Sequence, residues 1–146
     1  MAIQTDAKAT TFSLRTEYLS RGQYSKPLGE TDGFWGKIKL YAGGGENALH
    51  AHFDQAHSFV VLEGQMTFYD AEGTATVLNR YEGVMIPLGC YYRFQSTGDA
   101  NLVMLRFAAG SQTGARKGQD GSDHDGKGEE DMYVAPVKIP GKFFGD

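Results

Sequence analysis

Cysteine and long apolar runs are both scarce in this sequence. Cys90 is the only cysteine among 146 residues, so an internal disulfide is excluded and a reducing cytoplasm is the expected location. Polar residues interrupt the apolar ones throughout, and no stretch approaches the roughly 20 apolar residues that a membrane-spanning helix needs. Residues 1–8 lack the apolar core of a signal peptide, which argues against export by that route.

An excess of basic residues is also absent. The formal net charge is −4 and the Lys and Arg residues are scattered, so nucleic acid is not an expected partner. Apolar residues make up 40% of the chain, which is enough for a core, and 146 residues is the length of one domain. We therefore expect one domain over residues 1–146 whose partner is a small molecule.

Helical periodicity is the third feature that is missing. No segment of useful length repeats its apolar residues every 3.6 positions. Short extended runs alternate instead with turns rich in glycine, which reaches tight-turn conformations without steric cost. The expected strands are 34–42, 57–62, 66–69, 74–78, 84–86, 91–95 and 102–107. Many short strands at regular spacing predict a sandwich or a barrel.

Three segments lie outside this core of about residues 34–108. Residues 16–33 form a polar stretch that could be an ordinary loop or a lid over a pocket. Residues 111–131 are rich in glycine and charge, so we expect a mobile loop in which His124 is solvated. Residues 132–146 begin with an apolar run, which predicts docking onto a sheet or onto a partner subunit. That run and exposed sheet edges together predict a homodimer, joined through residues 132–139 or the N-terminal strand.

Three of the four histidines fall within one eight-residue window, as His50, His52 and His57. If residues 49–53 are extended, His50 and His52 point to the same side of a sheet. His57 follows a short polar break and opens a strand-like run, so a hairpin-like return would bring it alongside. The alternative is three unrelated structural histidines, but collecting three imidazoles on one concave face without a cation costs desolvation. The window therefore predicts a site for one divalent ion per chain.

This spacing resembles the first motif of the cupin superfamily, which runs Gly, five residues, His-x-His, three or four residues, Glu, six residues, Gly. Here the corresponding positions are Gly44, His50-Ala51-His52, His57 and Gly64. The run 84–94, with Pro87-Leu88-Gly89, is similar to the second motif, in which Pro-x-Gly is followed by a metal-binding His. The resemblance covers residues 34–108 and implies an all-β double-stranded β-helix, or jelly roll, with its site inside the barrel.

The sequence departs from this pattern at two positions, because His57 stands where the family has Glu and Tyr92 stands where it has the last His. One interpretation is a three-histidine ion site with Tyr92 as a nearby phenol, and another is a cupin that folds without metal. Three neutral imidazoles leave the charge of the ion uncompensated, so such a site would favour an anionic substrate oxygen. Imidazole suits iron, zinc, nickel and copper, and manganese is a further candidate, with iron favoured by the resemblance.

Tyr92 has three open roles: a metal ligand, a proton shuttle, or an aromatic wall residue whose hydroxyl makes one hydrogen bond. Tyr91 is the competitor if the register is off by one, since a one-residue slip reverses every side chain. Cys90 shares the parity of Tyr92 and could face the site or pack as a small apolar residue.

Candidate substrate-binding residues come from the apolar strands and from one arginine. The expected pocket-wall or core residues are Phe59, Val61, Met66, Phe68, Met85 and Phe94. Arg106 alternates with the apolar set Val103, Leu105 and Phe107. If that set faces the core between the sheets, Arg106 is solvated, which is the orientation the alternation favours. If the alternation is inverted, Arg106 enters the cavity and could pair with a substrate carboxylate.

The residues and the resemblance together predict a metal-dependent small-molecule enzyme, most concretely an Fe(II) three-histidine dioxygenase. The alternative within enzymes is a redox-neutral lyase, isomerase or cyclase that uses Tyr92 as acid or base. A non-catalytic cupin that binds a small molecule is a third hypothesis, because the fold does not choose between these functions.

Overall fold

The computed structural model describes residues 6–111, 116–120 and 134–146, and every regular element within them is a strand. Most of the expected mobile loop, including His124, lies outside the described residues. In the part of the chain that is described, no helix has the length and apolarity that crossing a membrane requires.

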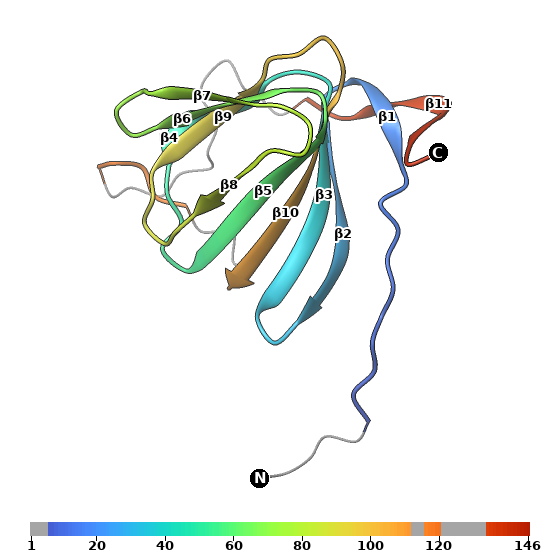
Figure 1. Cartoon of the computed structure of the whole chain (residues 1–146), viewed down its shortest axis with the longest axis horizontal. Helices are drawn as coiled ribbons and strands as arrows, with labels where there is room; N and C mark the ends of the chain where they lie inside the picture. Colours follow the sequence, from blue (N-terminus) through green and yellow to red (C-terminus); the bar gives the residue numbers. More distant parts are fainter. Residues whose placement is uncertain (1–5, 112–115, 121–133) are drawn as a thin grey trace.

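The strands form two sheets packed face to face and one two-stranded ribbon, all with antiparallel pairing (Figure 1). The five-stranded sheet has the order β2 (Gln23–Thr31), β3 (Phe34–Tyr41), β10 (Leu102–Gly110), β5 (Gln55–Glu63) and β8 (Gly83–Ile86). The four-stranded sheet has the order β4 (Gly45–His50), β9 (Tyr92–Ser96), β6 (Met66–Asp70) and β7 (Ala75–Leu78). The ribbon pairs β1 (Thr16–Arg21) with β11 (Val137–Phe144). From β4 to β10 the chain passes repeatedly between the two sheets, so the predicted all-β jelly roll is confirmed.

Strand β5 shows how the sequence builds the interior. Its buried residues alternate with half-buried ones, and His57, Phe59 and Val61 all point inward. Such alternation follows from the two-residue period of a strand. The apolar part of the core between the two sheets contains Tyr41, Phe59, Val61, Met66, Leu78, Ile86, Tyr92, Phe94, Leu102 and Met104.

The outer face of the five-stranded sheet is covered as well. A second cluster there joins Leu19, Leu28, Ile38, Leu40 and Val103, with Leu19 supplied by β1 of the ribbon. Strands β3 and β10 are therefore buried on both faces. This double burial explains why the apolar alternation of residues 102–107 does not reveal which set faces the barrel interior.

Residues 16–33 are neither a loop nor a lid, so the expectation of a polar loop over this segment is wrong. They form β1 and β2, which pair with β11 and β3 respectively. The polar composition arises because β2 is an edge strand, exposed along much of its length. Pro27 fits there because an edge strand has one backbone side without a sheet partner, and the register shifts next to it.

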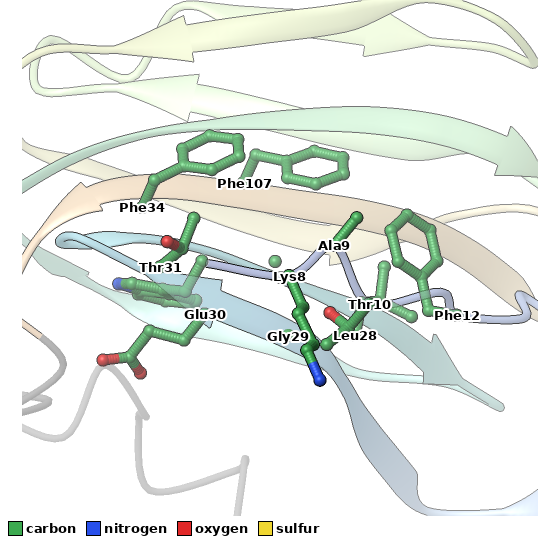
Figure 2. Close-up of a pocket in the computed structure, with 12 residues that line it drawn as sticks. Lys8, Ala9, Thr10, Phe12, Leu28, Gly29, Glu30, Thr31, Phe34 and Phe107 are labelled. Carbon is green, nitrogen blue, oxygen red and sulfur yellow. The ribbon is translucent and has the colours of Figure 1, made fainter. Parts of the chain in front are cut away.

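An apolar groove of about 420 Å³ lies on the outer face of the five-stranded sheet, beside the N-terminal segment. Figure 2 shows Phe34 and Phe107 together at its wall, with Lys8, Thr10 and Phe12 approaching from that segment. The two phenyl rings stack with their centroids 5.8 Å apart, and Phe34 remains 51% exposed. The homodimer joined through residues 132–139 or the N-terminal strand stays a prediction.

Two glycines allow a test of the close packing between strands. Gly64, between β5 and β6, has φ 79°, and a Cβ there would meet the backbone oxygen of Asn101 at 2.5 Å. Gly73, between β6 and β7, has φ 82°, and a Cβ there would meet nothing within 4 Å. Gly73→Ala should cost about 1–2 kcal/mol from left-handed backbone strain alone. Gly64→Ala should lower the unfolding free energy further, as measured by urea denaturation. Equal losses would contradict the close approach at Gly64.

Candidate functional site

The structure brings the three histidines of the sequence window together inside the barrel. His50 is the last residue of β4, His52 lies just beyond it, and His57 comes from β5. None of the three is more than 4% exposed. The ring centroids of His50 and His52 are 5.4 Å apart, and those of His52 and His57 are 5.0 Å apart.

Tyr92 lies in the same sheet as His50 and faces His57, which comes from the opposite sheet. It begins β9, pairs with His50 in register and is completely buried. Its hydroxyl oxygen lies 3.1 Å from Nε2 of His57 and 3.4 Å from Nε2 of His52. Tyr91 is directed elsewhere and donates a hydrogen bond to the backbone oxygen of Gly118. Tyr92, rather than Tyr91, is therefore the phenol inside the barrel, and half-buried Cys90 packs against the core beside it.

The hydrogen-bond partners indicate which atoms of His52, Tyr92 and His57 donate and which accept. Burial, followed by the positive charge of Arg106, lowers the pKa of His57 to about 2 and that of His52 to about 4, so both rings are neutral. Nε2 of Gln55 donates to Nδ1 of His52 at 3.1 Å, which leaves the proton of His52 on Nε2. His52 can then donate to the Tyr92 oxygen, and Tyr92 can donate to Nε2 of His57. With these donors and acceptors the proton of His57 is assigned to Nδ1, which is buried and has no hydrogen-bond partner among the described residues.

The carboxylate of Glu46 is a part of the site that the sequence analysis missed. It is buried in β4, and its oxygens lie 3.1 Å from Nε2 of His50, 3.6 Å from Nζ of Lys39 and 3.3 Å from Nη2 of Arg116. Burial raises the pKa of Glu46, but Lys39, the His50 hydrogen bond and Arg116 outweigh it and hold the pKa well below its ordinary value. Glu46 shares the even parity of His50 and His52, and that signal could have placed it on the same face.

His50 differs from the other two histidines in what its nitrogens contact. Nδ1 donates to the backbone oxygen of Ala48 at 2.9 Å, and Nε2 faces Glu46. Only His52 and His57 direct Nε2 at Tyr92. Across residues 6–111, 116–120 and 134–146, no three His, Cys, Asp or Glu side chains are arranged to hold one ion. Binding of one metal ion by His50, His52 and His57 stays a prediction.

The other predicted site residues occupy different depths of the barrel. The Phe59 ring lies 5.2 Å from the His57 ring and 5.9 Å from the Tyr92 ring, so Phe59 forms a wall of the site. Phe94 packs behind it at 5.4 Å, and Met66 is fully buried in the core. Neither of these two touches the histidines through a ring contact described in the structure.

Arg106 adopts the inverted orientation, which corrects the favoured expectation that it is solvated. It is only 5% exposed, and its guanidinium carbon lies 6.0 Å from the Phe59 ring centroid. The physical reason is the second cluster: Val103, Leu105 and Phe107 pack on the outer face of the sheet and leave the interior side to Arg106. Arg106 adds positive charge to the interior. Burial, followed by repulsion from Arg106, Arg116 and Lys37, lowers the pKa of Lys39 to about 8 despite the attraction of Glu46.

Comparison with known proteins identifies the fold. No family model and no curated protein matches the chain. A Klebsiella pneumoniae protein with a double-stranded β-helix domain superposes with a TM-score of 0.60 at 18% identity, over 73% of this chain and 95% of that one. A sugar phosphate isomerase of the cupin superfamily from Silicibacter pomeroyi gives 0.56 at 19% identity, over 73% and 79%. The Schizosaccharomyces pombe Cnp3 cupin domain gives 0.55 at 18% identity, and the match spans 61% of each chain. The chain therefore has the cupin fold, as the sequence predicted.

Removing the Glu46 charge should destabilise the protein. Glu46→Gln leaves buried Lys39 and half-buried Arg116 without their shared anion, and breaking a buried ion pair typically costs about 3–5 kcal/mol. Glu17→Gln is the matched control, because its ion pair with Lys138 is largely exposed and such pairs contribute about 0–1 kcal/mol. Urea denaturation at pH 7 measures both losses. A loss for Glu46→Gln no larger than the control would contradict a structural role for this carboxylate.

Acid should destabilise the protein through His52 and His57. Their pKa values in the folded state lie below the ordinary value of 6.5, so the unfolded chain binds more protons below that pH. Their contribution is complete above pH 6.5 and is lost as the pH falls toward 4, at up to about 1.4 kcal/mol per pH unit for each histidine. Unfolding free energies between pH 6.5 and 4.5 should show this slope. Replacing both histidines with Gln should remove it, and a slope that persists would refute the assignment.

Proposed function

We propose that this chain is a cupin-fold enzyme that performs redox-neutral proton transfer on a small molecule, as a lyase or an isomerase does. His57 is the residue that exchanges a proton with the substrate, and Tyr92 is its proton donor and acceptor. The proposal depends mainly on one observation, the hydrogen bonds that place the Tyr92 hydroxyl between Nε2 of His57 and Nε2 of His52.

Nδ1 of His57, which has no hydrogen-bond partner in the described structure, supports a substrate contact at that ring. A buried polar group without a partner costs free energy, so such groups in a folded protein call for an explanation. A carbonyl or hydroxyl oxygen of a bound molecule would accept the proton that Nδ1 carries. His57 would then bridge the substrate on one side and Tyr92 on the other.

Proton transfer through this arrangement balances without any redox change. As the Nδ1–H bond of His57 breaks and a substrate O–H bond forms, Nε2 of His57 takes the proton of Tyr92. The resulting phenolate accepts a hydrogen bond from Nε2 of His52 and is favoured by the positive charges of Arg106 and Arg116. Burial, followed by Glu46, raises the pKa of Tyr92 well above its ordinary value, so the resting residue is protonated. The reverse sequence removes a proton from the substrate.

The similarity to the Silicibacter pomeroyi isomerase supports this reaction class only as an analogy of fold. Isomerisation of a sugar phosphate is redox-neutral overall. Many chemistries share this fold, so the argument for proton transfer comes from His52, His57 and Tyr92.

An Fe(II) three-histidine dioxygenase is the second candidate function. The proximity of the three imidazole rings favours it. It requires Nε2 of His50 to leave Glu46 and join the nitrogens of His52 and His57 on one ion. Bound iron would supply oxygen activation, whereas zinc, nickel, manganese or copper would supply other chemistry. Metal dependence, the identity of the metal and a cytoplasmic location all stay predictions.

Tyr92→Phe tests the proposed proton transfer. The ring should keep its packing, since it stacks on Phe68 at 5.6 Å, while the variant removes only the hydroxyl. Deuterium incorporation from D₂O into hydroxyketones and 2-oxo acids, followed by NMR, should be about 10²–10⁴-fold slower than in the parent. The ¹⁵N signals of His57 should also change, because Nε2 loses its hydrogen-bond donor. Exchange as fast as in the parent would refute the role of Tyr92.

Metal analysis of protein purified without chelator separates the two candidate functions. For proton transfer we expect the same metal content in the parent, Tyr92→Phe and His57→Ala proteins, and no oxygen uptake after loading with iron. Stoichiometric metal that is lost in both His50→Ala and His57→Ala, together with oxygen uptake by the iron-loaded parent, would overturn the proposal in favour of the dioxygenase.

A further inference from the structure

We propose that Arg106 binds the negatively charged end of the ligand, a carboxylate or a phosphate, inside the barrel, so that the small molecule on which the chain acts is an anion. This inference rests on the proposed function and names its class of substrate. Arg106 makes no contact with the substrate in the proton transfer proposed above.

Within the described part of the chain, Arg106 is a buried cation without a counterion contact. It lies on β10 between Lys37 of β3 and Phe59 of β5, and it is only 5% exposed. Its Nε and Nη2 atoms are buried, and neither has a hydrogen-bond partner among the described residues. A guanidinium carries five N–H donors and cannot lose its charge in a protein, so leaving its donors unused in the interior is costly. The arrangement becomes favourable once an anion binds.

Trp35 adds a second unused donor at the same place. Its ring centroid lies 5.2 Å from the guanidinium carbon of Arg106, and it is 4% exposed. Its Nε1 atom is also buried with no partner in the described part of the chain. Arginine and tryptophan side chains have donors and no acceptors. The group that satisfies both residues must therefore be rich in acceptor oxygens, as carboxylates and phosphates are.

The surrounding charge favours an anion over a neutral acceptor. Lys37 and Lys39 lie on the same face of β3, and Arg116 lies close to Lys39 through Glu46. Glu46 contacts Lys39 and Arg116, but no contact joins it to Arg106 in the described structure. Burial, followed by Arg106, lowers the pKa of Lys37, as expected for neighbouring cations that share too little negative charge. A bound anion would relieve this repulsion.

Arg106 also lies at a useful distance from the proton-transfer residues. It pairs with Phe59, and His57 precedes Phe59 by two residues on the same face of β5. Such diagonal neighbours in a sheet are about 7–8 Å apart at Cα. A molecule of a few carbons can therefore place its anionic end on the guanidinium and its reacting oxygen on His57. We infer a small carboxylic acid or a small phosphate ester.

Calorimetric titration of the whole chain with inorganic phosphate, and separately with succinate, tests whether Arg106 binds the anionic end of the ligand. The parent should bind at least one of the two probes, and Arg106→Met should weaken its Kd by at least about tenfold, the effect of losing a charge-assisted hydrogen bond. Arg106→Lys keeps the charge but not the forked geometry, so it should weaken binding to an intermediate extent. Binding of phosphate alone indicates a phosphate ester as ligand, and binding of succinate alone indicates a carboxylic acid.

Arg93→Met is the matched control, because Arg93 packs on Tyr69, with 3.7 Å from its guanidinium carbon to the ring centroid, and it lies on β9 of the other sheet. It should bind both probes as the parent does. Tyr92→Phe should also retain binding, so a failure of the proton-transfer proposal leaves this test intact. A parent that binds neither probe, or an unchanged Kd in Arg106→Met, would overturn anion binding by Arg106 even if deuterium exchange is found.

Discussion

The buried carboxylate of Glu46 is the constraint on which the rest of the site depends. It contacts His50, Lys39 and Arg116, which come from β4, β3 and the short described segment of residues 116–120. That segment is fixed by a β-bridge between Lys117 and Ala51, so Arg116 is held beside the carboxylate. Because two charged groups removed from water need their partners, Glu46 ties both sheets and a distant segment into one arrangement.

Glu46 also divides the interior into two parts. His50 is directed toward the carboxylate, so only His52 and His57 direct Nε2 at the Tyr92 hydroxyl. On the other side, Arg106 has no share in the carboxylate and remains an unpaired cation among the described residues. The single negative charge of Glu46 thus leaves the neutral network of His52, His57 and Tyr92 next to the positive charge of Arg106. Proton transfer and anion binding are the two properties that this combination favours.

The sequence predicted the central strands and the meeting of the histidines with Tyr92 because both depend on local pattern. Alternation in residues 57–62 places His57 and Phe59 on one face, and the spacing of His50 and His52 does the same. Prediction from the sequence failed where the pairing strand lies far away in the chain. Residues 16–33 looked like a polar loop, because the β11 strand that pairs with β1 comes more than a hundred residues later.

The sequence by itself determined an all-β jelly roll and the meeting of three histidines with a tyrosine, whereas the choice of Tyr92 over Tyr91 came from the register that the structure shows. These features follow from the two-residue period of a strand and from glycine at the turns. Only the tertiary structure decided that Arg106 points inward, since both faces of β10 are buried and the apolar alternation fits either one. It likewise decided that His50 contacts Glu46, because the preference of an imidazole for a carboxylate or for a shared ion depends on which charges surround it in space.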